Sequence, residues 1–143
     1  MSNDTYFDAF IGLLGAFLSF FLGGIDGLIT ALFVLVGCDM VTGFMKGIIL
    51  KRLSSEIGFK GIAKKVCMFM IVGVANVLDN EILGQSEVLR DGVIMFYLAS
   101  EGISIFENAI DMGAPVPEGL KERFLSWCNK QLVSKNKPDV DDE

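Results

Sequence analysis

The chain has 143 residues, 52% of them hydrophobic, with a mean hydropathy of +0.52 and a formal net charge of −6. A soluble domain of this length could bury only part of so much apolar surface, which points to lipid as the main solvent, and the negative charge argues against nucleic acid as a partner. The sequence has no histidine, which excludes His-based triads and metal sites, so we expect a protein that is not an enzyme and has no catalytic residue, metal or cofactor.

Four apolar segments follow one another along the chain. They cover residues 9–25, 27–46, 66–78 and 92–110. A helix needs about 20 apolar residues to cross the hydrocarbon core, so the first and third segments are near the lower limit. The third becomes long enough if Lys64 and Lys65 extend their ammonium groups to the interface. We therefore predict an all-α, polytopic membrane protein with about four transmembrane helices.

The first segment can be placed in two ways. The glycine-rich joint "GGIDG" (23–27) predicts a tight turn after it. No Lys or Arg precedes Lys46, so charge does not orient this segment. If it spans the membrane, the N-terminus is cytoplasmic; if it lies in the interface, three spans remain and the N-terminus is outside. We favour spanning, because the run is uniformly apolar and has no polar face.

Basic residues are segregated along the chain. Six of the twelve lie within 46–65 and five lie in the tail, whereas Arg90 is surrounded by acids in the predicted loop 79–91. Positive charge stays in the cytoplasm, so we expect the loop 47–63 and the tail inside and residues 80–90 outside. The residues expected to set this topology from a basic loop are Lys51, Arg52, Lys60, Lys64 and Lys65.

The C-terminal part differs from the rest. We divide the chain into a transmembrane helical domain, 1–111, and a cytoplasmic tail, 112–143. Within the tail we predict a short amphipathic helix over 117–133, because Pro117 suits a first helical position and the apolar residues recur on one face. Those apolar residues are Leu120, Phe124, Trp127, Cys128 and Leu132. The polar end, "KNKPDVDDE", is expected to be disordered.

Polar residues form faces on the apolar segments. Asp39, Thr42 and Lys46 share one side of the second helix. An ionised Asp at the bilayer centre costs about 2.5–3.5 kcal/mol, so this side either meets water or another helix, or Asp39 lies close to the interface. On the fourth helix Tyr97, Glu101, Ser104 and Asn108 recur at helical spacing, and Asn76 continues one side of the third. The fourth-helix face predicts either a pore lining or a contact within or between subunits, and Glu101 could pair with Lys46.

Glycines mark candidate packing faces. Gly43 and Gly47 are spaced as in a GxxxG contact, and so are Gly23 and Gly27. Small residues at this spacing let two helices approach closely. The sequence leaves open whether these contacts are made within one chain or between chains.

An ordered series of motifs resembles one known family. The motifs are "LVGCDMVTGFMKGIILKRLSSEIGFKGIAKKV" (35–66), "VANVLD" (74–79) and "ASEGISIFENAIDMGAPVPEGLKERF" (99–124). They resemble the phage holin family that also includes the toxin-secretion holins of clostridia. The resemblance covers roughly residues 33–133 and carries no catalytic residue.

The resemblance implies a function. Members of this family are small multispanning proteins that accumulate in the bacterial cytoplasmic membrane and assemble into lesions, which release an endolysin or toxins. For this chain it implies the lipid bilayer and further copies of itself as partners, with an antiholin as another. Two alternatives stay open: a small ion channel or transporter using Asp39 and Glu101, and an antiholin-type regulator of such a pore.

Overall fold

The computed structural model describes residues 3–84, 86–119, 121–123 and 126. Its helices are α1 (Asn3–Phe21), α2 (Gly27–Ile49), α3 (Ser55–Glu81) and α4 (Val88–Asp111), and these described residues include no strand. The all-α prediction is confirmed. In the predicted tail helix, residues 118, 119, 121–123 and 126 are helical. Its apolar face (Leu120, Phe124, Trp127, Cys128 and Leu132) and the expected disordered end lie outside the described residues.

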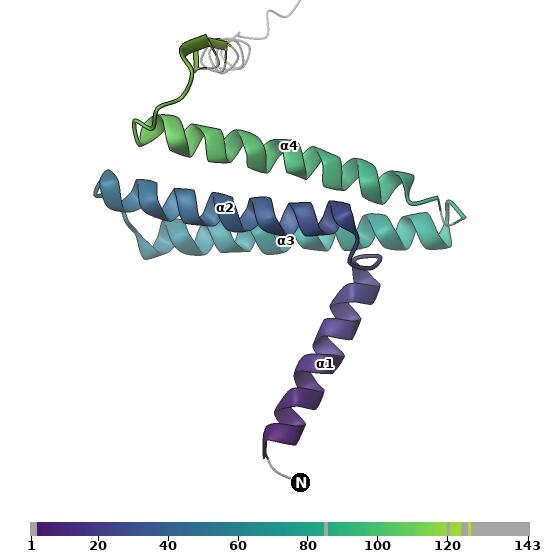
Figure 1. The fold of residues 1–143 in the computed structure, drawn as a ribbon. Helices are drawn as coiled ribbons and strands as arrows, with labels where there is room; N and C mark the ends of the chain where they lie inside the picture. Colours follow the sequence, from purple (N-terminus) through teal and green to yellow (C-terminus); the bar gives the residue numbers. More distant parts are fainter. Residues whose placement is uncertain (1–2, 85, 120, 124–125, 127–143) are drawn as a thin grey trace, which may run out of the picture.

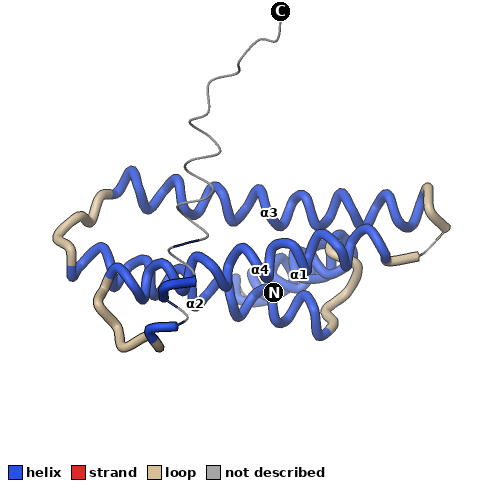
Figure 2. Tube along the Cα trace, turned by 90° about the horizontal axis from the view of Figure 1, so that it is seen from above, coloured by secondary structure: helices blue, strands red, loops and turns tan. Residues whose placement is uncertain are grey.

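Three helices form a bundle. Helices α2, α3 and α4 run alternately in opposite directions, and α4 packs against both of the others (Figures 1 and 2). Each of the three is long and apolar enough to cross a membrane. The α2–α3 loop and the C-terminal end of α4 lie at one end of the bundle, which we call the basic end (Figure 1). The α1–α2 turn and the α3–α4 loop lie at the other, which we call the Arg90 end.

Helix α3 begins earlier than the apolar pattern predicted. It starts at Ser55, so Lys60, Lys64 and Lys65 lie on the helix, and only Lys51 and Arg52 remain in the connection. The prediction that all five basic residues belong to a loop is therefore wrong. A helix can continue through charged residues when their side chains find partners, as Lys60 does with Glu56 one turn away at 2.8 Å.

The apolar core of the bundle is small. Its buried side chains come mainly from α2, α3 and α4: Leu22, Ile29, Leu32, Val36, Met68, Val72 and Ile94. Phe33 of α2 stacks on Phe69 of α3 with ring centroids 4.6 Å apart. Most large apolar side chains instead lie exposed on the outer surface of the helices. Such a surface suits lipid, which is as apolar as the side chains that meet it.

Helix α1 differs from the other three. It is a shorter apolar helix and diverges from the bundle (Figure 1). It is anchored near its C-terminal end, where the ring of Phe21 lies so close to Gly73 that a Cβ on this glycine would overlap it. Side chains farther along, such as Phe10 and Leu13, are exposed. Spanning of the membrane by α1 stays a prediction.

Candidate functional site: polar contacts inside the helix bundle

Three charged side chains meet between the three long helices. Lys65 of α3 pairs with Asp39 of α2, at 2.8 Å between Nζ and Oδ2, and with Glu101 of α4. Asp39 lies ten residues before Ile49, Lys65 ten residues after Ser55, and Glu101 ten residues before Asp111. At a rise of about 1.5 Å per residue, all three are about 15 Å from the basic end. Their side chains are 7–16% exposed, so this triad is largely shielded by the bundle.

Further polar contacts continue from the triad toward the basic end. Asn108 donates through Nδ2 to Asp39 Oδ1 and to Thr42 Oγ1, each at 3.2 Å. Its carbonyl oxygen accepts from Lys46 Nζ at 3.3 Å. Lys46 also pairs with Asp111 at 2.5 Å, where the two side chains are 31% and 49% exposed. We call these seven residues, Asp39, Thr42, Lys46, Lys65, Glu101, Asn108 and Asp111, the basic-end network.

The basic-end network forms a polar path from the interior to the surface of the bundle. Among the described residues, every buried side-chain nitrogen or oxygen has a hydrogen-bond partner. Charges within a membrane are tolerated when they pair and face the bundle interior, as these do. In the triad two carboxylates share one ammonium, so it carries one excess negative charge when all three groups are ionised.

The structure brings together five of the eight predicted polar-face residues: Asp39, Thr42, Lys46, Glu101 and Asn108. It changes one expected pairing, because Glu101 contacts Lys65, whereas Lys46 contacts Asp111. From the sequence, Lys65 was expected to set the topology and to extend its ammonium group to the interface, but the structure directs this group to Asp39 and Glu101 inside the bundle. With the helix bounds of the structure, Lys65 lies at the same depth as Asp39 and Glu101, but the bounds predicted for the third helix begin at residue 66 and hide this agreement.

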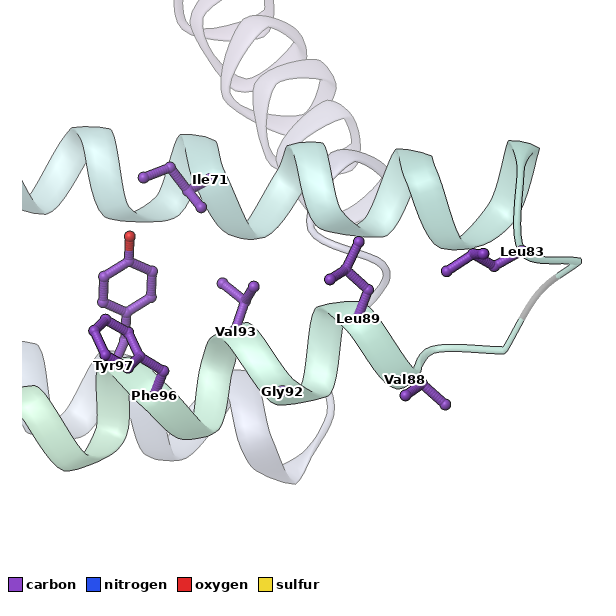
Figure 3. Close-up of a pocket in the computed structure, with 8 residues that line it drawn as sticks. All are labelled: Ile71, Leu83, Val88, Leu89, Gly92, Val93, Phe96 and Tyr97. Atoms are coloured by element: carbon purple, nitrogen blue, oxygen red, sulfur yellow. The ribbon is translucent and has the colours of Figure 1, made fainter.

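Tyr97, Ser104 and Asn76 lie outside this network. Ser104 is half-buried on α4. The ring of Tyr97 lines a cavity of about 480 Å³ between α3 and α4, with its hydroxyl directed toward α3 (Figure 3). The cavity's other lining residues, among them Ile71, Val93 and Phe96, carry no charge. This cavity therefore suits apolar groups rather than ions.

A second polar cluster lies at the Arg90 end. The side chain of Arg90 is 1% exposed and donates to Asp26 Oδ2 at 2.6 Å, to Asp91 Oδ1 at 3.2 Å and to the carbonyl oxygens of Leu22 and Gly24 at 2.6 and 3.4 Å. The sequence placed Arg90 in an external loop, whereas the structure places it on α4. The signal that could have identified it is the acid-rich sequence on both sides of a lone arginine. We call Asp26, Asn76, Asp79, Arg90 and Asp91 the Arg90 cluster.

The Arg90 cluster ties helix ends together. Asp79 accepts from the backbone N–H groups of Leu89 and Arg90 at 3.2 and 2.7 Å, which satisfies donors in the first turn of α4. Asn76 donates to the carbonyl of Phe21 at 3.1 Å, at the end of α1. Asp26 accepts from the N–H of Ile29 at 2.8 Å and caps α2.

Asp26 lies outside the spanning helices and has a perturbed pKa. Burial alone would raise the pKa of its carboxyl group. The hydrogen bonds from Arg90 and from the N–H of Ile29 stabilise the ionised form and bring the pKa below its ordinary value of 3.8. Asp26 is therefore a carboxylate at neutral pH.

The predicted packing glycines differ in their surroundings. Gly23 has φ +83°, and a Cβ there would overlap the side chain of Asn76 and lie 2.7 Å from Arg90 Nε. A Cβ at Gly43 would lie 3.6 Å from Asn108 Nδ2, which is an ordinary contact, and a Cβ at Gly47 would lie 3.2 Å from Leu53 Cδ1, which is a tight one. A Cβ at Gly27 would meet no atom within 4 Å. Of these four glycines, Gly23 makes a close approach within the chain, and the role of the other three as packing residues stays a prediction.

The chain is similar to known proteins. A sequence model described as the bacteriophage holin family matches residues 16–127. An uncharacterised protein of Listeria innocua is 41% identical over 133 residues, which are 92% of this chain and 94% of that protein. A protein named a probable holin, from Bacillus phage phi105, is 33% identical over 100 residues, 68% of this chain and 73% of its own length. No solved structure matches the chain.

Proposed function

We propose a membrane-permeabilising function for this chain, which belongs to the bacteriophage holin family. Family membership and its probable-holin relative support a holin-like role. In the proposed mechanism, copies of the chain accumulate in the bacterial cytoplasmic membrane and assemble into homo-oligomeric lesions. The lesions release an endolysin, or a toxin in another setting, and an antiholin could join and delay the assembly.

The observation that carries this proposal is the basic-end network. Its contacts between helices, at Lys65, Asn108 and Lys46, join one side chain to another. A second copy of the chain carries the same side chains and could supply the same partners. Polar groups buried inside one chain could therefore re-form their contacts between chains, without leaving a charge unpaired in lipid.

Assembly by this exchange depends on concentration. Association of identical chains follows mass action, so monomers dominate until the protein has accumulated. Once subunits separate their helices, we propose that the polar faces of α2 and α4 line a water-filled lumen. The lining would include the residues of both faces, Asp39, Thr42, Lys46, Tyr97, Glu101, Ser104 and Asn108, together with Asn76 of α3.

The orientation we propose follows from the charges. Lys46, Lys51, Arg52, Lys60 and Lys64 lie toward the basic end, which we place in the cytoplasm together with the C-terminus. We test this with single cysteines in a background without Cys38, Cys67 and Cys128. A membrane-impermeant reagent should not label Ser55→Cys in intact cells; labelling would reverse the orientation. For Asn3→Cys, labelling indicates that the N-terminus is outside and α1 lies in the interface, and protection indicates that α1 spans.

Glu101 provides the direct test of the lumen. We expect Glu101→Leu to insert normally, because Lys65 keeps Asp39 as its partner, but to impair permeabilisation by removing a polar group from the lining. Glu101→Gln keeps the shape and hydrogen bonding and should have a mild effect. The measurement is the time from induction to loss of membrane potential at matched protein levels.

Glu107→Leu is the matched control, since it removes the same charge from an exposed position of α4. Wild-type timing in Glu101→Leu would contradict the proposed lining. The form of the wild-type response separates the alternatives. An abrupt loss of potential after a delay supports a holin, a graded conductance supports a channel, and the absence of both supports a regulator.

A further inference from the structure

A groove of about 550 Å³ separates α2 from α3 near the basic end. Apolar side chains of both helices line it, including Phe44 on α2 and Ile57 on α3. The wall formed by α3 carries Gly58 and Gly61, and a Cβ at either position would meet no atom within 4 Å. The rest of the described chain therefore leaves this wall uncovered. Beside a spanning helix such a groove must be filled by something apolar, because an empty space forfeits the dispersion contacts of its lining.

The cationic residue lining the groove is free to bind an anion. Arg52 lines it, next to Lys51 in the α2–α3 connection. Neither side chain has an ion-pair partner among the described residues. Lys65 and Asp39 also line the groove, but they pair with each other about 15 Å from the basic end. The combination is an apolar groove with one unpaired guanidinium near the cytoplasmic surface that we propose.

We propose that this groove binds an anionic phospholipid, with an acyl chain along Gly58 and Gly61 and the phosphate at Arg52. A guanidinium presents a fork of donors that matches phosphate oxygens. Basic pockets between transmembrane helices on the cytoplasmic side bind lipid head groups of this class. The acyl chain of the lipid provides apolar contacts along the wall of the groove, and its phosphate provides a counter-charge for Arg52.

Charge also disfavours a second copy of the chain as the occupant. Copies inserted with the same orientation bring their basic ends to the same depth of the membrane. A neighbour that brings its Lys51, Arg52 or Lys64 to the groove would place like charges beside the unpaired Arg52. An anionic lipid removes this repulsion. The proposal does not depend on pore formation, and its test involves no lysis.

The test uses the full-length protein in nanodiscs that contain equal amounts of dioleoyl phosphatidylglycerol and dioleoyl phosphatidylcholine. After mild release into the gas phase, native mass spectrometry counts the lipids that each chain retains. We expect wild type to retain phosphatidylglycerol in preference to phosphatidylcholine. Arg52→Gln should lower this preference about fivefold, the factor expected for one basic residue near an anionic lipid surface. Lys64→Gln, which removes the same charge outside the groove, should change it little.

A second pair of variants tests the groove itself. Gly61→Leu places a side chain in the groove at a position where a Cβ meets no atom within 4 Å, and it should reduce retention of both lipids. Gly37→Leu is the matched control on an exposed position of α2, where a Cβ also meets nothing within 4 Å. Circular dichroism confirms that each variant keeps its helices.

Three results would overturn the proposal. The first is equal retention of the two lipids by wild type. The second is an equal effect within either pair of variants. Equal effects of Lys64→Gln and Arg52→Gln would indicate general attraction to the basic surface, and equal effects of Gly37→Leu and Gly61→Leu would indicate that the lipid does not occupy the groove. The third is efficient disulfide crosslinking between copies of Gly61→Cys, in a background without the native cysteines, which would place a second copy in the groove.

Discussion

The two ends of the bundle satisfy their buried polar and charged groups with different partners. At the Arg90 end, charged side chains bind backbone groups in addition to Asp26 and Asp91: Arg90 donates to carbonyls after α1, and Asp79 accepts from N–H groups at the start of α4. At the basic end, side chains of three continuous helices bind one another. The backbone partners lie at helix ends, where the turns of one chain position them, whereas the side-chain partners lie along continuous helices that another copy can present as well. The Arg90 cluster therefore holds the fold, and the basic-end network can exchange its contacts.

The largest expected effect is at Arg90 itself. Arg90→Met leaves Asp26 and the carbonyl of Leu22 without their donor, in a site where the arginine side chain is 1% exposed. Asp26 is 44% exposed and can be hydrated, so the cost comes mainly from the carbonyls of Leu22 and Gly24, and a buried acceptor left without a donor costs about 1–3 kcal/mol. We therefore expect Arg90→Met to lose a large part of its free energy of unfolding, measured by denaturant titration in micelles and by protease resistance in membranes.

Asp91→Asn is the control for this variant. It removes the more distant partner of Arg90, at 3.2 Å, on a side chain that is 42% exposed. An exposed ion pair contributes about 0–1 kcal/mol, so the effect should be small. Equal stability of the two variants would mean that Arg90 does not hold the helix ends together.

At the Arg90 end, alanine substitutions of Gly23 and Gly27 are expected to differ in their effect on stability. Gly23→Ala places a Cβ against Asn76 and Arg90 at a residue with φ +83°, a backbone conformation that alanine rarely adopts. We expect a loss of about 1–3 kcal/mol, the usual cost of overpacking. Gly27→Ala enters open space at the start of α2 and should leave the free energy of unfolding nearly unchanged. The pair is measured by the same titration, and equal losses would show that the Arg90 cluster tolerates displacement.

A smaller effect on folding than at Arg90, with a clear effect on the timing of permeabilisation, is expected at Lys65. Lys65→Met leaves Asp39 and Glu101 facing each other without their shared ammonium. The repulsion should weaken the closed bundle and shorten the delay before membrane potential is lost, opposite in direction to Glu101→Leu. Adding Glu101→Gln removes one of the two charges and should restore part of the delay. Residues in direct contact couple by about 0.5–3 kcal/mol, which sets the size of this restoration.

This double-mutant comparison can fail in an informative way. If the effects of Lys65→Met and Glu101→Gln simply add, the two side chains do not interact in the membrane. If Lys65→Met reduces the free energy of unfolding as strongly as Arg90→Met, the basic-end network holds the fold rather than exchanging contacts. The contrast between the two ends would then be lost.

The sequence by itself determined the helices, the polar faces and the family. Apolar runs of membrane-spanning length predicted α2 and α4 closely, because helix formation in lipid depends mainly on local hydrophobicity. The three- and four-residue spacing of Asp39, Thr42 and Lys46 placed them on one face for the same local reason. The ordered motifs of 35–124 were enough to indicate the holin family, which the comparisons confirmed.

Only the tertiary structure decided which charges pair. From its position in the sequence, Lys65 indicates the orientation of the chain, and Arg90 is expected in an external loop. Their partners lie on other helices, and contact depends on the relative rotation and depth of those helices, which periodicity within one segment does not specify. The early start of α3 at Ser55 has the same cause, because charged residues can extend a helix when neighbouring helices or turns neutralise them. Local hydrophobicity thus fixed the elements, and long-range electrostatic pairing fixed how they meet.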